Sequence, residues 1–218
     1  LKLLFELESA MGRAATLEDL ARAVVASAAR ACQARAGGLL VDEGEGGVWL
    51  YFVDVSGRPS VRNLEEEATI EVKRVPVKRG EGILGWSMHH NQAASVPPQA
   101  SRALPSAGEH DVTILDDDLT PPQSRQRTNV AGVLVTSAIA VPLEGADDAA
   151  IGGIALYNSK KPLGFSQDDR SLLRLVSANA TTALQLFRSR IEQEKSERLS
   201  AIGRLISGVM HDMRTPLT

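Results

Sequence analysis

The side chains best suited to chemistry lie in the C-terminal stretch ISGVMHDMRTPLT, residues 206–218. His211 and Asp212 are neighbours, and an imidazole can act as a nucleophile or proton carrier near neutral pH. Thr215 follows four residues later and shares one helix face with His211. Pro216 removes a backbone donor and clashes with the preceding turn, so a helix should bend or end there. This pattern suits a histidine that meets another protein.

The apolar residues around this histidine have the spacing of a coiled coil. The steps between them are three, four, three and four, over Leu199, Ile202, Ile206, Val209 and Met213. Such a heptad seam predicts a dimer of helices. His211 is two residues from both Val209 and Met213, so we expect its ring to point away from the seam into solvent. A single helix with a solvated face is the alternative interpretation.

A second short seam, made by Leu184, Phe187 and Ile191, precedes the first one. The charged run EQEKSER separates the two seams. A regular heptad seam alternates steps of three and four residues, but joining these two seams needs several successive steps of four. The seams are therefore out of phase, as they would be after a stutter, an insertion of four residues into the heptad pattern. The helix carrying both seams should start after Ser166, which is a good N-cap, with Asp168 and Asp169 in the first turn. No Gly-Pro break follows for about 50 residues, a length that suits a helix leaving its domain.

The motif HDMRTPLT, residues 211–218, resembles the H-box of sensor histidine kinases. The resemblance implies that His211 is the autophosphorylated residue and that Asp212 hydrogen-bonds its imidazole. It also implies that Thr215 helps place a hydrolytic water and that Pro216 bends the helix. ATP and Mg²⁺ would be held by a separate ATP-binding domain, and the phosphoryl group would pass to a response regulator. Because these residues contain no Gly-rich nucleotide box, we expect a truncated piece of a longer kinase.

The residues before the long helix predict an α+β domain. Thr16 should cap a helix that runs through LARAVVASAARACQ, includes Cys32 and stops at Ala36–Gly38. Leu3, Leu4, Leu7 and Met11 indicate a shorter helix over residues 1–15. Five β-rich runs follow, at about residues 37–44, 48–57, 70–77, 137–144 and 149–158, and a brief apolar run lies at residues 94–96. The Pro-rich residues 97–130 predict a long loop with one short strand, VTIL.

Four segments in this region resemble those of GAF domains, in family order: GEGILGWSMHHNQAASV, SAIAVPLE, IGGIALYN and FSQDDRSLLRLVSANATTALQ. The resemblance implies an antiparallel sheet of about six strands with helices on both sides. The first and last helices would pack on one face. The helix of Trp86 and the long loop would enclose a pocket on the other.

The ligand of such a pocket is left open by the sequence. Asn158, Lys160, Phe165 and Asp169 partly match a cyclic-nucleotide signature, but Arg170 replaces its final Glu. His110, His89 or His90 could ligate a haem, although solvated histidines are the commoner case. Trp49, Tyr51 and Phe52 suit core and edge positions better than a ligand cage. The pocket could also be empty.

Cys32 is the only cysteine of the chain. A single thiol argues against methionine-sulfoxide reduction, and its helix is the wrong place for tetrapyrrole attachment. The structural alternative is that Cys32 is simply a small core or helix-face residue.

Composition narrows the classes of protein to which this chain could belong. The chain has 218 residues, of which 43% are hydrophobic and 23% charged, and its net charge is −3. These values suit a packed globular domain and argue against a dedicated nucleic-acid binder. No apolar run approaches the roughly 20 residues of a membrane span, and a single cysteine suits a reducing cytoplasm. No metal site is expected.

The sequence therefore predicts three parts. Residues 1–188 form a GAF sensory domain, residues 189–199 a coiled-coil signalling linker, and residues 200–218 the start of a histidine-kinase dimerisation and phospho-acceptor helix. The predicted function is that of a cytoplasmic, homodimeric sensor histidine kinase of a two-component system, in which a signal at the GAF domain controls His211. The fragment alone should be inactive. The alternative is a non-enzymatic GAF ligand-binding or dimerisation module joined to another output, such as a transcription activator.

Overall fold

A computed structural model describes residue 9 and residues 12–56, 70–78, 80–96, 113–114, 129–145 and 149–213. Most of the helix predicted over residues 1–15 lies outside these ranges, as does most of the predicted loop 97–130. The chain divides into two compact units, Leu1–Thr181 and Thr182–Thr218.

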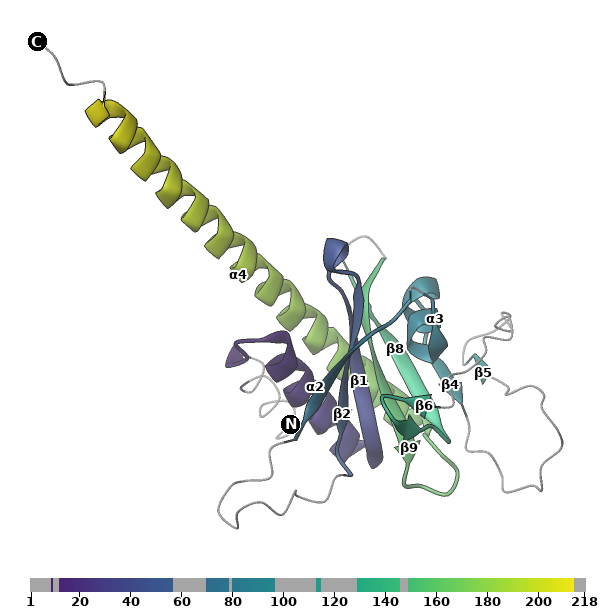
Figure 1. Cartoon of the computed structure of the whole chain (residues 1–218). Coiled ribbons are helices and arrows are strands. Elements are labelled where there is room, and N and C mark those ends of the chain that lie inside the picture. Colours follow the sequence, from purple (N-terminus) through teal and green to yellow (C-terminus); the bar gives the residue numbers. More distant parts are fainter. Residues whose placement is uncertain are drawn as a thin grey trace, which may run out of the picture. The chain divides into compact units, whose positions relative to one another are not determined.

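The first unit is built on an antiparallel sheet with the strand order β3-β2-β1-β9-β8-β4-β5 (Figure 1). Its strands are β1 (Ala34–Asp42), β2 (Val48–Asp54), β3 (Val72–Pro76), β4 (Ala94–Val96), β5 (Thr113–Ile114), β8 (Ala138–Glu144) and β9 (Ala150–Ser159). All five predicted β-rich runs contain strands, the apolar run 94–96 is β4, and the two-residue β5 falls within the predicted VTIL strand. The hairpin of β6 (Asn129–Val130) and β7 (Val133–Leu134) forms a separate small sheet that was not predicted.

The strands β1 and β2 are joined by the short 3-10 helix η1 (Gly44–Gly46), which closes their hairpin. The order of β1, β9 and β8 at the centre of the sheet is fixed by two antiparallel registers. Leu39 pairs with Ile154 across β1 and β9, and Ala140 pairs with Ala155 across β8 and β9. These registers set which side chains share a face.

The helix α2 (Leu17–Ala31) starts as predicted and ends earlier than predicted. Thr16 is its N-cap and accepts a hydrogen bond from the backbone N–H of Asp19 at 3.1 Å. The helix does not reach the predicted stop at Ala36–Gly38, because β1 already begins at Ala34. Gly37 instead provides close packing inside the sheet. A Cβ at this position would lie 2.6 Å from Val25 Cγ1 and 2.7 Å from the carbonyl oxygen of Ala155.

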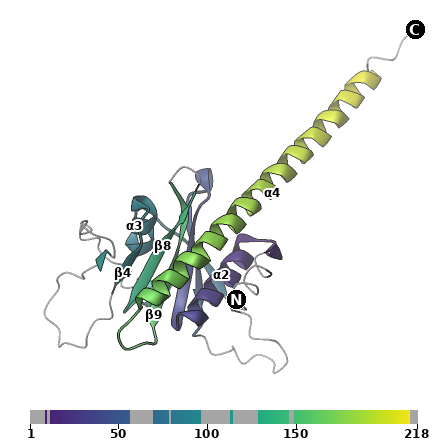
Figure 2. The same ribbon diagram turned by 180° about the vertical axis from the view of Figure 1, so that it is seen from behind.

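The helix α2 and the first turns of α4 (Gln167–Met213) cover one face of the sheet (Figure 2). The strands turn large aliphatic side chains to this helix-packed face, and all of them are buried: Leu39, Val41, Ile139, Val141, Leu143, Ile154 and Leu156. Burial of so much apolar surface is the main stabilising term for the domain. Cys32, the C-cap of α2, is fully buried near this face, with Sγ 3.8 Å from the carbonyl oxygen of Asp169.

The short helix α3 (Gly82–His90) covers the opposite face of the sheet. The side chains that β1, β4, β8 and β9 turn to this face are mostly small: Ala36, Gly38, Ala94, Ala138, Ala140, Gly153 and Ala155. Leu84 of α3 sits over Gly153, where a Cβ would lie 2.8 Å from its Cδ1. We call this side the α3 face. Its small side chains allow α3 to approach the sheet closely.

The long helix α4 spans 47 residues from Gln167 to Met213, close to the length predicted. Asp169 Oδ2 accepts the backbone N–H of Ser166 at 2.8 Å, and the Asp169 N–H donates to Ser166 Oγ at 3.3 Å. This reciprocal pair is a capping box, so the predicted N-cap is confirmed. It fixes where the helix starts.

Candidate functional site

A cavity of about 60 Å³ lies on the α3 face of the first unit. The first turn of α3 forms one wall, from Gly82 to Gly85. Leu40 and Leu50 of the sheet lie in its floor, and Val130 and Val135 close another side. The lining is apolar apart from Glu81 and the hydroxyl of Tyr157. A concave, mostly apolar cavity with few polar groups is the usual form of a small-molecule site.

Tyr157 is the residue of this cavity that sequence reasoning missed. It lies in β9 between Ala36 and Ala138, its partners on the two neighbouring strands, and its ring stacks on Phe52 with centroids 6.1 Å apart. The side chain is only 3% exposed, and burial raises the pKa of Tyr157. Its hydroxyl therefore stays protonated at physiological pH and is available as a hydrogen-bond donor. Successive residues of a strand point to opposite faces, so in IGGIALYN the residues Gly153, Ala155 and Tyr157 share one face. This alternation is the sequence signal that could have placed Tyr157 on the side of the cavity.

Asn158 holds the segment that closes the cavity. Its Oδ1 accepts hydrogen bonds from the backbone N–H of Thr136 at 2.7 Å and from Thr136 Oγ1 at 3.0 Å. Its Nδ2 donates to the carbonyl oxygen of Leu134 at 2.7 Å. These bonds fix residues 134–136 beside the wall residue Val135. Asn158 itself does not line the cavity, so its role there is to position the wall.

The other residues of the partial cyclic-nucleotide signature also act structurally. Lys161, the residue after the signature's Lys160, pairs with Asp169, with Nζ 2.7 Å from both carboxylate oxygens. Burial of Asp169 opposes its ionisation, but the hydrogen bonds from Lys161 and Ser166 outweigh this effect and lower the pKa of Asp169. The pair ties the loop after β9 to the start of α4. Neither residue lines the cavity.

The cysteine and the predicted haem ligands lie elsewhere. Burial raises the pKa of Cys32 to about 12, so the thiol is protonated and unreactive. His89 and His90 are exposed, and the His90 ring stacks on Trp86 with centroids 4.3 Å apart. His89 borders a second hollow of about 270 Å³, whose lining shares Leu40 and Gly85 with the first cavity. His110 lies outside the described residues. Within the described ranges, no cluster of three potential metal ligands occurs.

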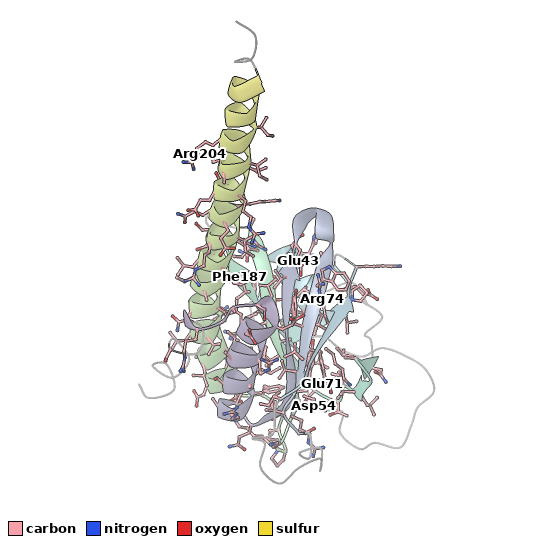
Figure 3. The ribbon with its side chains drawn as sticks, turned by 60° about the vertical axis from the view of Figure 1, so that its left-hand side comes forward. Glu43, Asp54, Glu71, Arg74, Phe187 and Arg204 are labelled. Carbon is pink, nitrogen blue, oxygen red and sulfur yellow. The ribbon has the colours of Figure 1, made fainter. Side chains whose placement is uncertain are left out.

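The aromatic residues of β2 are core and edge residues, as expected. Phe52 is buried on the α3 face, whereas Tyr51 faces the other way and donates a hydrogen bond to Glu43 Oε1 at 2.5 Å. Arg74 completes this group, with Nη2 2.7 Å from Glu43 Oε2 and its guanidinium 3.9 Å from the Trp49 ring centroid (Figure 3). Trp49 also takes part, since its Nε1–H donates to the carbonyl oxygen of Gly46 at 2.6 Å. The cluster therefore has a structural role at the sheet edge.

The predicted phospho-acceptor region belongs to the second unit, Thr182–Thr218. The backbone is helical through His211 and Asp212 to Met213, and their side chains lie outside the described set. Thr215 and Pro216 lie beyond the described residues altogether. Three seam residues are exposed on this helix, with exposed fractions of 66% for Leu199, 52% for Ile202 and 59% for Ile206.

The sheet order, the two helices on one face and the cavity under α3 on the other define a domain of the GAF class. The chain belongs to the GAF domain family, because the family model matches residues 14–185, well over half of the sequence. The predicted GAF fold is thus confirmed. No curated protein matches the chain.

Solved GAF domains share this fold at low identity. A phosphoenolpyruvate-protein phosphotransferase domain from Coxiella burnetii is 13% identical, with a TM-score of 0.54 over 87% of this chain and 94% of that one. Residues 122 to 287 of a methyl-accepting chemotaxis protein are 12% identical, with a TM-score of 0.54 over 86% and 99%. Free methionine-R-sulfoxide reductase from Neisseria meningitidis is 14% identical, with a TM-score of 0.52 over 86% and 89%. These similarities concern the fold.

None of the described helices combines the length and the apolar character needed to cross a bilayer.

Proposed function

We propose that this chain is the sensory and phospho-acceptor part of a two-component sensor histidine kinase. The observation that carries the proposal is the motif HDMRTPLT, with His211 at the end of a helix that runs unbroken from the GAF domain. Residues 189–199 serve as the signalling linker and residues 200–218 begin the dimerisation and phospho-acceptor helix. The complete kinase works in the cytoplasm as a homodimer.

The dimer is supported by the exposed stripe of Leu199, Ile202 and Ile206. Their spacing of three and four residues continues to Val209 and Met213, as the seam of a two-stranded coiled coil does. A helix segment with this much charge gains little from folding alone, so pairing with a second copy supplies its stability. In such a dimer, the His211 residues of both copies lie on the same coiled coil.

The proposed reaction is phosphoryl transfer to the imidazole of His211. A ring nitrogen attacks the γ-phosphorus of ATP, the bond to the bridging oxygen breaks, ADP leaves and the ring proton is lost to solvent. Asp212 hydrogen-bonds the imidazole and fixes its tautomer. ATP and Mg²⁺ would be held by the kinase's ATP-binding domain, which supplies charge neutralisation for the transfer. Thr215 helps place a hydrolytic water for phosphatase action toward the phosphorylated response regulator, and Pro216 bends the helix below the site. The acceptor of the next step is a response-regulator aspartate.

The proposal is tested by mixing this chain with the ATP-binding domain encoded by the same gene and labelled ATP. The chain should take up label that is stable to alkali and lost in acid, as a phosphohistidine is. His211→Gln should abolish the labelling. His90→Gln is the matched control, since His90 is also exposed but lies in α3, and it should leave the labelling unchanged. Label that persists in His211→Gln would reject the assignment.

A second candidate is a GAF ligand-binding or dimerisation module joined to another output. It is favoured by the same fold in domains of a chemotaxis protein and a phosphotransferase. The gene sequence after Thr218 separates the two. A second hairpin helix and a nucleotide-binding domain support the kinase, whereas a DNA-binding or other output domain supports the module.

A further inference from the structure

The loop between β9 and α4, residues 160–166, begins beside the cavity wall and ends at the first turn of α4. Before the loop, Asn158 holds residues 134–136, which we call the wall segment, by three hydrogen bonds of 2.7 to 3.0 Å. Its backbone N–H adds a fourth bond, to the carbonyl oxygen of Ser137 at 2.8 Å. The Asn158 backbone is left-handed, with a φ of 57°, which asparagine adopts more readily than most residues. Asn158 therefore fixes the wall segment through both its side chain and its backbone.

Ser159 joins the wall segment to the loop. Its backbone N–H donates to Oγ of Ser137 at 3.0 Å, and Ser137 is buried. Its own hydroxyl accepts the backbone N–H of Lys161 at 3.1 Å and donates to the carbonyl oxygen of Gly164 at 3.2 Å. Because this hydroxyl acts as donor and acceptor at the same time, it holds two points of the loop against the end of β9.

Lys161 joins the loop to the start of α4. Its Nζ lies 2.7 Å from both carboxylate oxygens of Asp169, whose side chain is only 5% exposed. The same carboxylate accepts hydrogen bonds from the backbone N–H and the hydroxyl of Ser166, at 2.8 and 2.9 Å. A carboxylate buried to this extent is costly without a cation beside it. The loop and the first turn of α4 should therefore keep or lose their structure together.

We propose that this loop couples the wall segment to the first turn of α4, so that loosening of either one loosens the other. Each end has a bonded and a released state, and the hydrogen bonds through Asn158, Ser159, Lys161 and Asp169 make the two bonded states favour each other. The inference rests on the sensory part of the proposed function, because it names the route by which a change at the cavity wall reaches α4. It needs neither a bound ligand nor phosphorylation of His211.

Hydrogen exchange of the whole chain, followed by NMR for individual amides, tests the coupling. The N–H of Thr136 reports on the wall segment, because Asn158 Oδ1 is its acceptor. The N–H of Arg170 reports on the first turn of α4, because it donates to the carbonyl oxygen of Ser166 at 3.1 Å. Amides at the centre of β1 and β9 report on global unfolding, so local opening can be distinguished from it.

Each end is altered by a substitution and the exchange is measured at the other end. Asn158→Ala removes the three side-chain bonds of the wall segment and leaves every group at the start of α4 in place. We expect it to speed exchange of the Arg170 N–H by about three- to tenfold, a usual size for coupling through such a network. Asp169→Asn removes the charge that pairs with Lys161, and it should speed exchange of the Thr136 N–H as well, because coupling between two sites is reciprocal.

Two further variants test the route and its specificity. In a chain that already carries Ser159→Ala, Asn158→Ala should no longer change exchange of the Arg170 N–H, because the hydroxyl between the two ends is gone. Thr16→Val is the matched control, since it removes the N-cap hydroxyl of α2, a capped helix start that lies outside this loop. It should leave exchange of both reporter amides as it is in the wild type.

Three results would overturn the inference. The first is a reporter amide that exchanges as in the wild type when the far end is altered, and the second is an effect of Asn158→Ala that persists beside Ser159→Ala. The third is exchange that speeds equally at the centre of the sheet, which is global unfolding. Failed labelling of His211 with coupled ends would reject the kinase and leave this link in place, whereas intact labelling with uncoupled ends would reject the link alone.

Discussion

The two faces of the central sheet are built from different sizes of side chain. On the helix-packed face, β8 and β9 present Ile139, Val141, Ile154 and Leu156, all fully buried. On the α3 face the residues between them are Ala138, Ala140, Gly153 and Ala155. The same strands thus make a filled core on one side and a hollow one on the other.

Because the side chains of the two faces differ in size, the two faces should contribute differently to stability and to ligand binding. Large aliphatic side chains contribute to stability in proportion to the apolar area that they bury. Small side chains contribute little, but they leave room for a ligand between the sheet and α3. We therefore expect substitutions on the helix-packed face to change stability first, and substitutions on the α3 face to change binding first.

The largest expected effect comes from truncating matched leucines on the two faces. Leu39→Ala should lower the free energy of unfolding by about 2–5 kcal/mol, because Leu39 is fully buried among aliphatic side chains. Leu50→Ala should lose about 1–2 kcal/mol, since Leu50 borders a cavity that already exists. Urea unfolding followed by circular dichroism measures both. Equal losses would mean that the two faces are packed alike.

A second comparison uses the polar side chains that hold loops in place on the two faces. Asp169→Asn, which breaks the pair with Lys161 beside the helix-packed face, should cost about 1–3 kcal/mol at pH 7. Asn158→Ala, which releases residues 134–136 on the α3 face, should cost about 1–2 kcal/mol. The two losses should differ in their dependence on pH.

The direction of the pH dependence of the Asp169→Asn cost follows from the lowered pKa of Asp169. A carboxylate with a lowered folded pKa stabilises the fold above its unfolded value of 3.8, and this contribution is lost as pH falls through the folded pKa. The cost of Asp169→Asn should thus be constant from pH 7 to about pH 5 and shrink below about pH 4. The cost of Asn158→Ala should not change, because an amide does not titrate. An unchanged Asp169→Asn cost at pH 3 would contradict the ionic pairing.

The last comparison is between two adjacent glycines of β1 that face opposite sides. A Cβ on Gly37 would meet Val25 Cγ1 and also the rigid backbone oxygen of Ala155 at 2.7 Å. Gly37→Ala should cost about 1–3 kcal/mol, the usual range for overpacking. A Cβ on Gly38 would meet only the end of the Leu50 side chain within 3.4 Å, so Gly38→Ala should cost less than about 1 kcal/mol. Thermal unfolding of the two variants checks the order.

Much of this fold could be predicted from local sequence. Residue periodicity and capping chemistry predict five of the strands, the N-caps at Thr16 and Ser166, and the length of α4. The end of α2 was predicted too late, because alanine and glycine near residue 36 fit a helix end as well as a sheet centre. Gly37 is required by contacts with Val25 and Ala155, which no local pattern contains.

The candidate site was less accessible to sequence reasoning. The partial signature at Asn158 and Asp169 left the ligand open, and both residues hold loops in place. Tyr157 depends on long-range pairing, since its neighbours Ala36 and Ala138 come from distant parts of the chain. The hairpin β6–β7, which supplies the wall residue Val130, begins at the end of the Pro-rich residues 97–130 and was not predicted. The role of His211 depends on its motif alone and stays a prediction.

The two tryptophans of the chain lie on different sides of this sheet. Trp49 is partly exposed beneath the Arg74 guanidinium, and Trp86 is buried in α3 with an indole N–H that has no hydrogen-bond partner among the described residues. Replacing either one with phenylalanine leaves a single fluorophore. One such protein reports events at the sheet edge and the other reports movement of α3, so native fluorescence can distinguish local opening from global unfolding without an added label.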